Sequence, residues 1–287
     1  MCDNVLPASL LTNGSPSMQT LQKEEREALQ KSFDENGYFI LRNVVSKDKL
    51  SELHRSITEE FNRAKSSGEL FVGGGQLSGH LNCFPGEQSR FAYDTIVEHG
   101  IVDLMKAISP RTPVTPDVGC NFNMPNSMPQ HYHVDSPFTE HFMIVNVAMV
   151  DTVIANGAID VLPGTHKKFY KYWRFTVERV SRLTTRLPLN QGDVLVRSSN
   201  LWHRGMPNRT SNPRPMLAFT FVKGRDEREP RDPFQIDHGK IRFHPNWFRP
   251  NFLGRVRERT FVTVPFTYSA FRFVRSLIGN KGYGTLA

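Results

Sequence analysis

Apolar and polar residues follow helical spacing near the start of the chain. Charged and apolar residues alternate in this way from Leu21 to Phe33, and Asn36-Gly37 predicts the end of that helix. The apolar run Tyr38 to Leu41 predicts a short buried strand. Ser46 is a candidate N-cap for a second helix, whose apolar residues recur every three or four positions: Leu50, Leu53, Ile57 and Phe61. We expect both helices to pack on one face of a sheet.

Beyond a predicted helix at about 95–108, the pattern changes to short apolar or alternating segments separated by Pro, Gly and Asn. These segments predict strands at 118–123, 130–135, 142–150, 158–162, 193–198 and 215–223. Such strands indicate a mainly β protein with flanking helices and a jelly-roll or sandwich core. We expect a loose tail over 1–18, one domain over 19–265 and a C-terminal extension over 266–287.

The composition limits the cellular locations and the kinds of partner that we expect for the protein. Three cysteines in 287 residues are too few and too scattered for a disulfide framework or a thiolate metal site, which predicts a reducing, cytoplasmic location. The N-terminus lacks the basic and apolar regions of a secretory signal, and no segment is long enough to span a bilayer. The net charge of +8 suits nucleic acid, an anionic membrane or acidic small molecules. Because no recognition motif accompanies the charge, we expect no nucleic-acid partner.

Candidate chemistry centres on the segment from Gln130 to Asp135. In a strand, residues two apart share a face, so His133 and Asp135 would point together into a barrel. His203, from a later strand, is a candidate third ligand, and two histidines with one carboxylate form a typical non-haem Fe(II) site. His131 competes for the same role, because His131-x-His133 is the cupin ligand pair. The cupin pattern requires a glutamate a few residues later, and Glu140 lies slightly too far away, which favours His133 with Asp135.

Several nearby residues have two interpretations. His131 is then either close to the ligands and the substrate, or structural. Trp202 beside His203 is a substrate platform or, more simply, a core residue. Arg214, at the start of an apolar strand, is suited to bidentate capture of a carboxylate.

The chain resembles the phytanoyl-CoA dioxygenase family of Fe(II)/2-oxoglutarate oxygenases over roughly residues 30 to 224. The segment Phe33 to Val44 is similar to the family's opening segment, and His133-Val134-Asp135 and the turn Asn156 to His166 follow in the family's order. Gly192-Asp193 then leads to His203 and Arg214. The joint order and spacing of these motifs carry the resemblance.

The resemblance implies a double-stranded β-helix with His133, Asp135 and His203 as iron ligands and Arg214 as the clamp for the distal carboxylate of 2-oxoglutarate. It also places Asn121 and Asn123 where relatives have polar cosubstrate contacts. The implied reaction uses Fe(II), 2-oxoglutarate and O2 to hydroxylate an unactivated C–H bond, with release of succinate and CO2. Desaturation or ring closure would need the same residues.

The substrate is less constrained by the sequence. Loops at 71–90 and 225–250 are candidate lids, and their arginines favour a small polar or anionic metabolite, a sugar or a lipid head group. A non-catalytic jelly-roll protein that binds an anionic ligand is the alternative, although it would be expected to have lost a ligand. The stretch Phe266 to Ile278 is interpreted as a terminal packing helix, or else as an amphipathic helix at a membrane surface.

Overall fold

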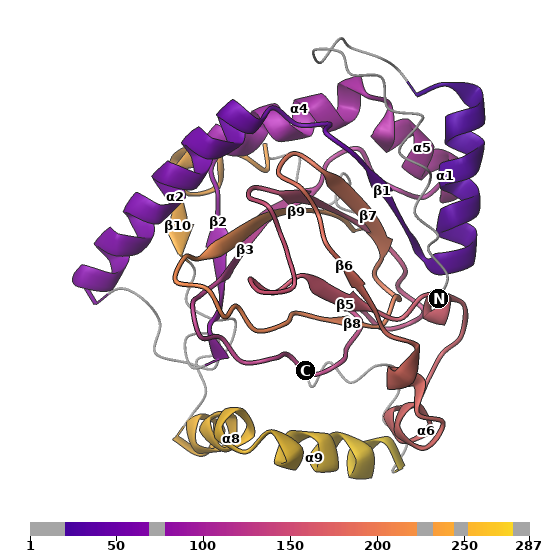
Figure 1. Ribbon diagram of the computed structural model, residues 1–287, viewed down its shortest axis with the longest axis vertical. Coiled ribbons are helices and arrows are strands. Elements are labelled where there is room, and N and C mark those ends of the chain that lie inside the picture. The colour runs from indigo at the N-terminus through magenta and orange to yellow at the C-terminus, as the bar shows by residue number, and fades with distance from the viewer. Residues whose placement is uncertain (1–20, 69–77, 223–231, 244–251, 278–287) are drawn as a thin grey trace.

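The computed structural model describes residues 21–68, 78–222, 232–243 and 252–277. A seven-stranded antiparallel sheet in the order β1-β7-β4-β9-β3-β2-β10 faces a three-stranded sheet in the order β6-β5-β8 (Figure 1). The strands of the large sheet are β1 (Tyr38–Leu41), β2 (His80–Phe84), β3 (Asp117–Asn123), β4 (Met143–Ala148), β7 (Val194–Ser198), β9 (Arg214–Phe221) and β10 (Arg242–Phe243). Those of the small sheet are β5 (Ile159–Val161), β6 (Thr185–Leu187) and β8 (His203–Arg204). The predicted double-stranded β-helix is confirmed.

Helices cover the outer face of the large sheet (Figure 1). These are α1 (Lys23–Asn36), α2 (Lys47–Ser66), α4 (Arg90–Glu98) and α5 (Ile101–Ile108). The remaining helices are α6 (Tyr172–Val177), α8 (Phe252–Thr263) and α9 (Pro265–Leu277), with short 3₁₀ turns η2 (Glu87–Ser89), η3 (Thr165–Lys167), η4 (Val180–Leu183) and η5 (Ile236–Gly239). Both α8 and α9 lie apart from the sheets, along one edge of the molecule, with α6 beside α9 (Figure 1).

The period-two pattern of the strands in the large sheet sends alternate residues to its two faces. Outward residues such as Phe39, Val145 and Phe219 join the helices in the main core. The opposite face looks into the barrel, and cross-strand register places Asn123 opposite both His80 and Arg214 on it. The barrel interior is therefore polar at one end, where these side chains form a row.

Most predicted elements have their expected type. Gly37 ends α1 with a φ of 84°, a left-handed conformation that glycine adopts without strain, and a Cβ there would lie 2.6 Å from His166 Nδ1. Ser46 stands at the predicted N-cap of α2, but its hydroxyl makes no capping hydrogen bond. The helix predicted at 95–108 is two helices, α4 and α5, because Gly100 adopts a left-handed φ of 70° between them.

Two expectations about segments need correction. The strand predicted at 130–135 is wrong: only His133 pairs, in an isolated bridge with His203. The candidate lid at 71–90 contains β2 and η2, which belong to the fold itself. The predicted tail 1–18, the rest of that loop at 71–77, and most of the candidate lid at 225–250 lie outside the described residues.

The cysteines are less scattered than their sequence positions indicate. Pairing of β2 with β3 places Cys83 directly opposite Cys120, and both are buried free thiols. Burial raises the pKa of Cys120 to about 12. In the described part of the chain, no helix is long and apolar enough to cross a bilayer.

Candidate metal centre

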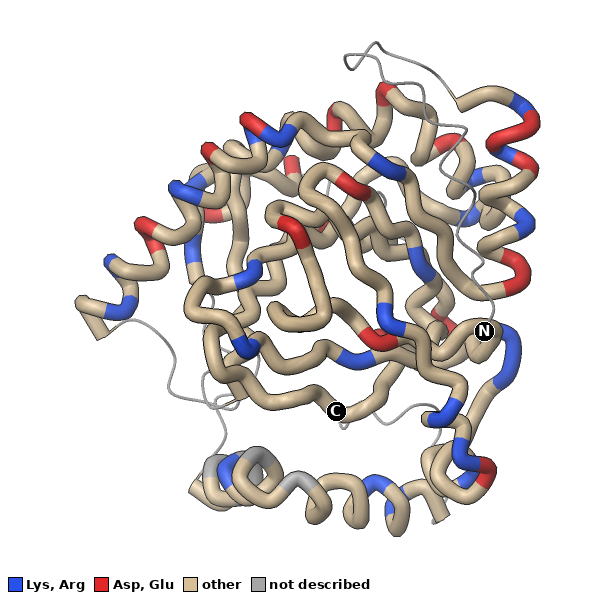
Figure 2. Tube along the Cα trace, viewed as in Figure 1, with Lys and Arg blue, Asp and Glu red and all other residues tan. Residues whose placement is uncertain are grey.

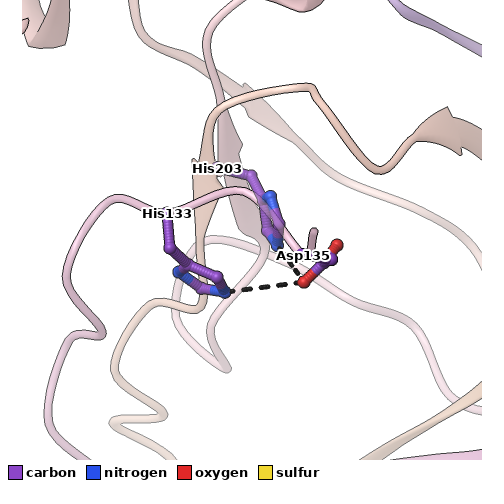
Figure 3. Close-up of side chains that lie close together, drawn as sticks. All are labelled: His133, Asp135 and His203. Carbon is purple, nitrogen blue, oxygen red and sulfur yellow. Dashed lines mark ion pairs between the residues drawn. The ribbon is translucent and has the colours of Figure 1, made fainter. Parts of the chain in front are cut away.

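The three predicted ligands converge. Their donor atoms all lie within 4.8 Å of one another, and within the described residues this is the one group of three or more His, Cys, Asp or Glu side chains so arranged. Asp135 Oδ1 lies 3.8 Å from His133 Nε2 and 3.6 Å from His203 Nε2. Figure 3 shows both imidazoles turned toward the same carboxylate oxygen. The arrangement offers two nitrogen donors and one oxygen donor to a single cation.

Backbone hydrogen bonds set the spacing of the two histidines. His133 N donates to His203 O, and His203 N donates to His133 O, both at 2.9 Å. This reciprocal pair joins the loop after Pro129 to β8, and the two rings lie 4.3 Å apart. The bridge therefore performs the alignment that the sequence analysis assigned to a full strand.

The outer ring nitrogens fix the orientation of both imidazoles. His133 Nδ1 lies 2.8 Å from the His131 carbonyl oxygen, and His203 Nδ1 lies 2.9 Å from the Leu201 carbonyl oxygen. A carbonyl only accepts, so each Nδ1 carries the proton and each Nε2 presents its lone pair to the centre. Burial lowers the pKa of both histidines, which favours the neutral form that binds a metal.

The carboxylate is held ionised by a buried arginine that the sequence analysis missed. Burial by itself would raise the pKa of Asp135, but the charge of Arg197 and its hydrogen bond to the carboxylate outweigh burial and hold the pKa below its ordinary value. Arg197 Nη1 donates to Asp135 Oδ2 at 2.5 Å, and Arg197 Nε donates to Asn146 Oδ1 at 3.1 Å. Arg197 thus occupies one carboxylate oxygen and leaves Oδ1 for the centre.

Arg214 is a buried cation that has no ion-pair partner among the described residues. It is 5% exposed, its Nη2 donates to Gly157 O at 3.1 Å, and its Nε has no hydrogen-bond partner. Among the residues that the structure describes, no carboxylate forms an ion pair with it, and burial lowers its pKa to about 10. A buried guanidinium with an unused donor is suited to a ligand carboxylate.

Asn123 and His80 line the barrel beside Arg214. Asn123 is 1% exposed, donates to Met206 O at 3.0 Å and has an unpartnered Oδ1. Asn121 shares its face, as expected, but is exposed. His80, which the sequence analysis did not consider, lies 2.7 Å through Nε2 from Met128 O, and burial lowers its pKa to about 4, with further lowering from Arg214 and His133. Strand register places His80 opposite Asn123, which in turn lies opposite Arg214.

The other two candidates face α9. His131 lies next to Tyr268, with ring centroids 4.4 Å apart, and burial lowers its pKa to about 4. Trp202 is 2% exposed and stacks on Phe175 at 4.0 Å, which places it in the core interpretation instead of on a substrate-facing wall. Arg272 lies over the Trp202 ring at 5.9 Å. Both Tyr268 and Arg272 were missed, because their position depends on how α9 folds back.

Comparison with known proteins agrees with this geometry. A family model described as phytanoyl-CoA dioxygenase (PhyH) matches residues 33–216, which include the triad and Arg214. Three similar solved structures are the epimerase SnoN in complex with Fe3+, alpha ketoglutarate and nogalamycin RO, the alpha-ketoglutarate-dependent carbocyclase SnoK from nogalamycin biosynthesis, and AviO1 from Streptomyces viridochromogenes Tue57.

These three structures share the fold of the chain at low sequence identity. SnoN has a TM-score of 0.53 at 17% identity, over 71% of this chain and 85% of its own. SnoK has 0.54 at 14%, over 74% and 88%, and AviO1 has 0.54 at 18%, over 72% and 97%. The family match covers more than half of the sequence. The chain therefore belongs to the phytanoyl-CoA dioxygenase family, whose enzymes depend on non-haem iron and 2-oxoglutarate.

Proposed function

We propose that His133, Asp135 and His203 hold Fe(II), and that Arg214 binds the distal carboxylate of 2-oxoglutarate. The observation that carries the proposal is the convergence of three donors within 4.8 Å, with both Nδ1 atoms committed to backbone carbonyls. Iron prefers this donor set when it must keep coordination positions open. The unpartnered Nε of Arg214 supports the second assignment.

When bound, iron would activate O2, which is the oxidant, and the balanced reaction converts R–H, O2 and 2-oxoglutarate into R–OH, CO2 and succinate. The residues of the chain provide the conditions. Arg197 keeps Asp135 anionic, His133 and His203 stay neutral, and Arg214 orients the cosubstrate from the barrel wall. Asn123, through its unpartnered Oδ1, and His80 are proposed to border the same pocket.

For the substrate, we propose a small polar or anionic metabolite, a sugar or a lipid head group, oxidised at an unactivated C–H bond. Support comes from the polar barrel face and from His131, which contacts Tyr268 at the edge of the site. SnoN and SnoK are an epimerase and a carbocyclase, so an outcome other than hydroxylation belongs to the same proposal. We propose a cytoplasmic location, which the free thiols of Cys83 and Cys120 support.

An anaerobic binding experiment tests the assignment without knowledge of the substrate. Purified protein is loaded with Fe(II) and 2-oxoglutarate without oxygen, and the weak visible absorption of the chelate is recorded before air is admitted and succinate is measured. We expect stoichiometric binding and slow succinate release. Binding without any succinate, even with candidate substrates, would favour the non-catalytic alternative, and failure to bind iron would overturn the proposal.

A further inference from the structure

Helix α9 has its polar stripe turned inward and its apolar stripe turned outward. Tyr268, Arg272 and Ser276 recur every four residues and face the barrel side, where Arg272 and Ser276 are 5% and 6% exposed. The outward stripe consists of Phe266, Ala270, Val274 and Leu277, all exposed. A helix at the surface of a globular protein ordinarily shows the reverse arrangement.

The inward contacts fix this orientation. Arg272 Nη1 donates to Tyr132 O at 2.6 Å, and its guanidinium lies 4.0 Å from the Tyr172 ring centroid. Ser276 Oγ accepts a hydrogen bond from Trp173 N at 2.9 Å. A rotation that buried the apolar stripe would break these contacts and expose Tyr268, so the outward stripe is a property of the folded chain.

The neighbouring helix enlarges the apolar surface. Seven of the fourteen large hydrophobic side chains that the structure describes as exposed lie on or between α8 and α9: Phe252, Leu253, Val256, Val264, Phe266, Val274 and Leu277. Phe252, Leu253 and Phe266 are each more than 70% exposed. Concentration of this kind marks an interaction surface, whereas scattered single residues do not.

The positive charge of α8 and α9 favours an anionic partner over a second copy of the chain. Residues 252–277 include five arginines and a single acidic residue, Glu258, and Arg259 and Arg275 are exposed. Two copies of this surface facing each other would bring like charges together, which disfavours self-association. Apolar side chains interleaved with arginines suit the interface of an anionic bilayer, where the apolar groups enter the lipid and the arginines meet the head groups.

We propose that the α8–α9 surface, defined by the seven exposed hydrophobic residues with Arg259 and Arg275, docks the protein on an anionic phospholipid bilayer. On the inward face of α9, Tyr268 contacts His131 beside the proposed metal site, so docking would hold the entrance of the barrel beside the lipid. Membrane binding does not depend on the proposed catalytic assignment and is tested separately.

Flotation of the full-length protein with vesicles tests the proposal directly. The vesicles contain either phosphatidylcholine alone or phosphatidylcholine with 30 mol% phosphatidylserine, about the anionic content that gives a strong surface potential. We expect at least tenfold stronger binding to the anionic vesicles, and weaker binding as salt is raised. Protein that stays with the supernatant on both vesicles would overturn the proposal.

Three variants assign the binding to the surface. The triple change Phe266→Ser, Val274→Ser and Leu277→Ser should reduce binding more than tenfold, because it removes the apolar stripe. The pair Arg259→Gln and Arg275→Gln should lower affinity for anionic vesicles roughly 30-fold, the combined effect of about fivefold per arginine. A matched control changes exposed residues elsewhere, Val97→Ser, Val153→Ser and Ile154→Ser, and should leave binding unchanged.

Two outcomes would point to other partners. If size-exclusion chromatography with light scattering shows a dimer that the triple serine variant dissociates, the surface joins two copies of the chain and the bilayer proposal is wrong. If the control variant loses vesicle binding as strongly as the triple variant, the binding is not localised to α8–α9. Far-UV circular dichroism and anaerobic 2-oxoglutarate binding, which should be the same in all variants, show that each is folded.

Discussion

Two aspartates, one at the candidate metal centre and one on the small sheet, show how arginine pairing separates a structural carboxylate from a proposed metal ligand. Asp160, on β5, is 2% exposed, and its two oxygens accept from Arg186 Nε at 2.5 Å and Arg204 Nε at 2.9 Å. Asp135 has one such partner, Arg197, and its second oxygen faces two imidazoles. Figure 2 shows arginine and lysine positions, in blue, along the strands and loops of the barrel.

The difference lies in the charge left over. The two guanidinium groups carry more positive charge than Asp160 carries negative charge, so a further cation is not attracted to this carboxylate. Asp135 and Arg197 balance each other, while the neutral histidines add donors without adding charge. We therefore expect a divalent ion to bind at Asp135 and not at Asp160.

Asp135→Asn should have the largest effect, because it keeps the shape of the side chain and removes the anionic ligand. We expect turnover to fall about 1,000-fold or more, which corresponds to roughly 4 kcal/mol, together with loss of Fe(II) binding measured by anaerobic titration. Full activity in this variant, combined with loss of activity in His131→Ala, would show that the ligand assignment is wrong.

Asp160→Asn should act on stability and leave the metal site alone. The change leaves Arg186 and Arg204, which are largely buried, without their carboxylate partner. We expect the free energy of unfolding, measured by urea denaturation, to fall by about 3 kcal/mol. Iron affinity per folded molecule should match that of the unchanged protein. If Asp160→Asn lowered the iron affinity without lowering stability, the assignment of Asp160 as a structural residue would be wrong.

Arg214→Met tests a buried cation that has no protein anion. We expect the KM for 2-oxoglutarate to rise about 100-fold, or roughly 2.7 kcal/mol, while iron binding is retained. Because the variant removes an uncompensated buried charge, the protein without cosubstrate should be at least as stable as before. The contrasting result, strong destabilisation with an unchanged KM, would make Arg214 a structural residue.

Arg197→Met separates the positioning of Asp135 from direct ligation. Loss of the 2.5 Å contact should weaken iron binding about 10- to 100-fold, the usual effect of removing a partner of a ligand. The pKa of Asp135 should rise, so iron binding should require a higher pH than in the unchanged protein. Arg204→Met is the matched control, since it removes a similar contact from Asp160; equal losses of iron affinity in both variants would contradict the comparison.

The smallest effect concerns His166, a half-buried imidazole whose Nδ1 has no hydrogen-bond partner. Burial lowers its pKa from 6.5 to about 4. Above pH 6.5 both folded and unfolded chains carry it neutral; as the pH falls toward 4, only the unfolded chain gains the proton, so stability declines and then levels off. We expect a loss of about 2 kcal/mol, discounted for partial exposure, in urea titrations with a chelator, and a flatter profile for His166→Gln. An unchanged profile in that variant would exclude His166 as the cause.

Local patterns predicted much of the fold, because periodicity reports which face of an element is buried. The strand at Tyr38–Leu41 has its predicted bounds, and β3, β4, β7 and β9 differ from theirs by a few residues. The strand predicted at 130–135 is wrong, because the segment is held by separate backbone hydrogen bonds of Gln130, His133 and Asp135 to distant residues and not by its own periodicity. The spacing of His133 and Asp135 correctly predicted that they lie together, but the cause is the pairing of this segment with distant residues.

Parts of the site were out of reach of the same reasoning. The positions of His80 and Tyr268 depend on strand register and on the packing of α9, which a single sequence does not reveal. Arg197 had a signal that was passed over: it ends the apolar run Val194-Leu195-Val196. A charged residue in a strand buried on both faces requires a counter-ion, which in the structure is Asp135.

The bridge between His133 and His203 has a consequence for how such enzymes diversify. Since main-chain bonds hold the two histidines together, their separation is independent of the long excursion of chain that connects them. Loops within that excursion can lengthen, shorten or change composition while the ligand geometry is preserved. The shape of the space around the three proposed ligands can thereby change while the ligands keep their places.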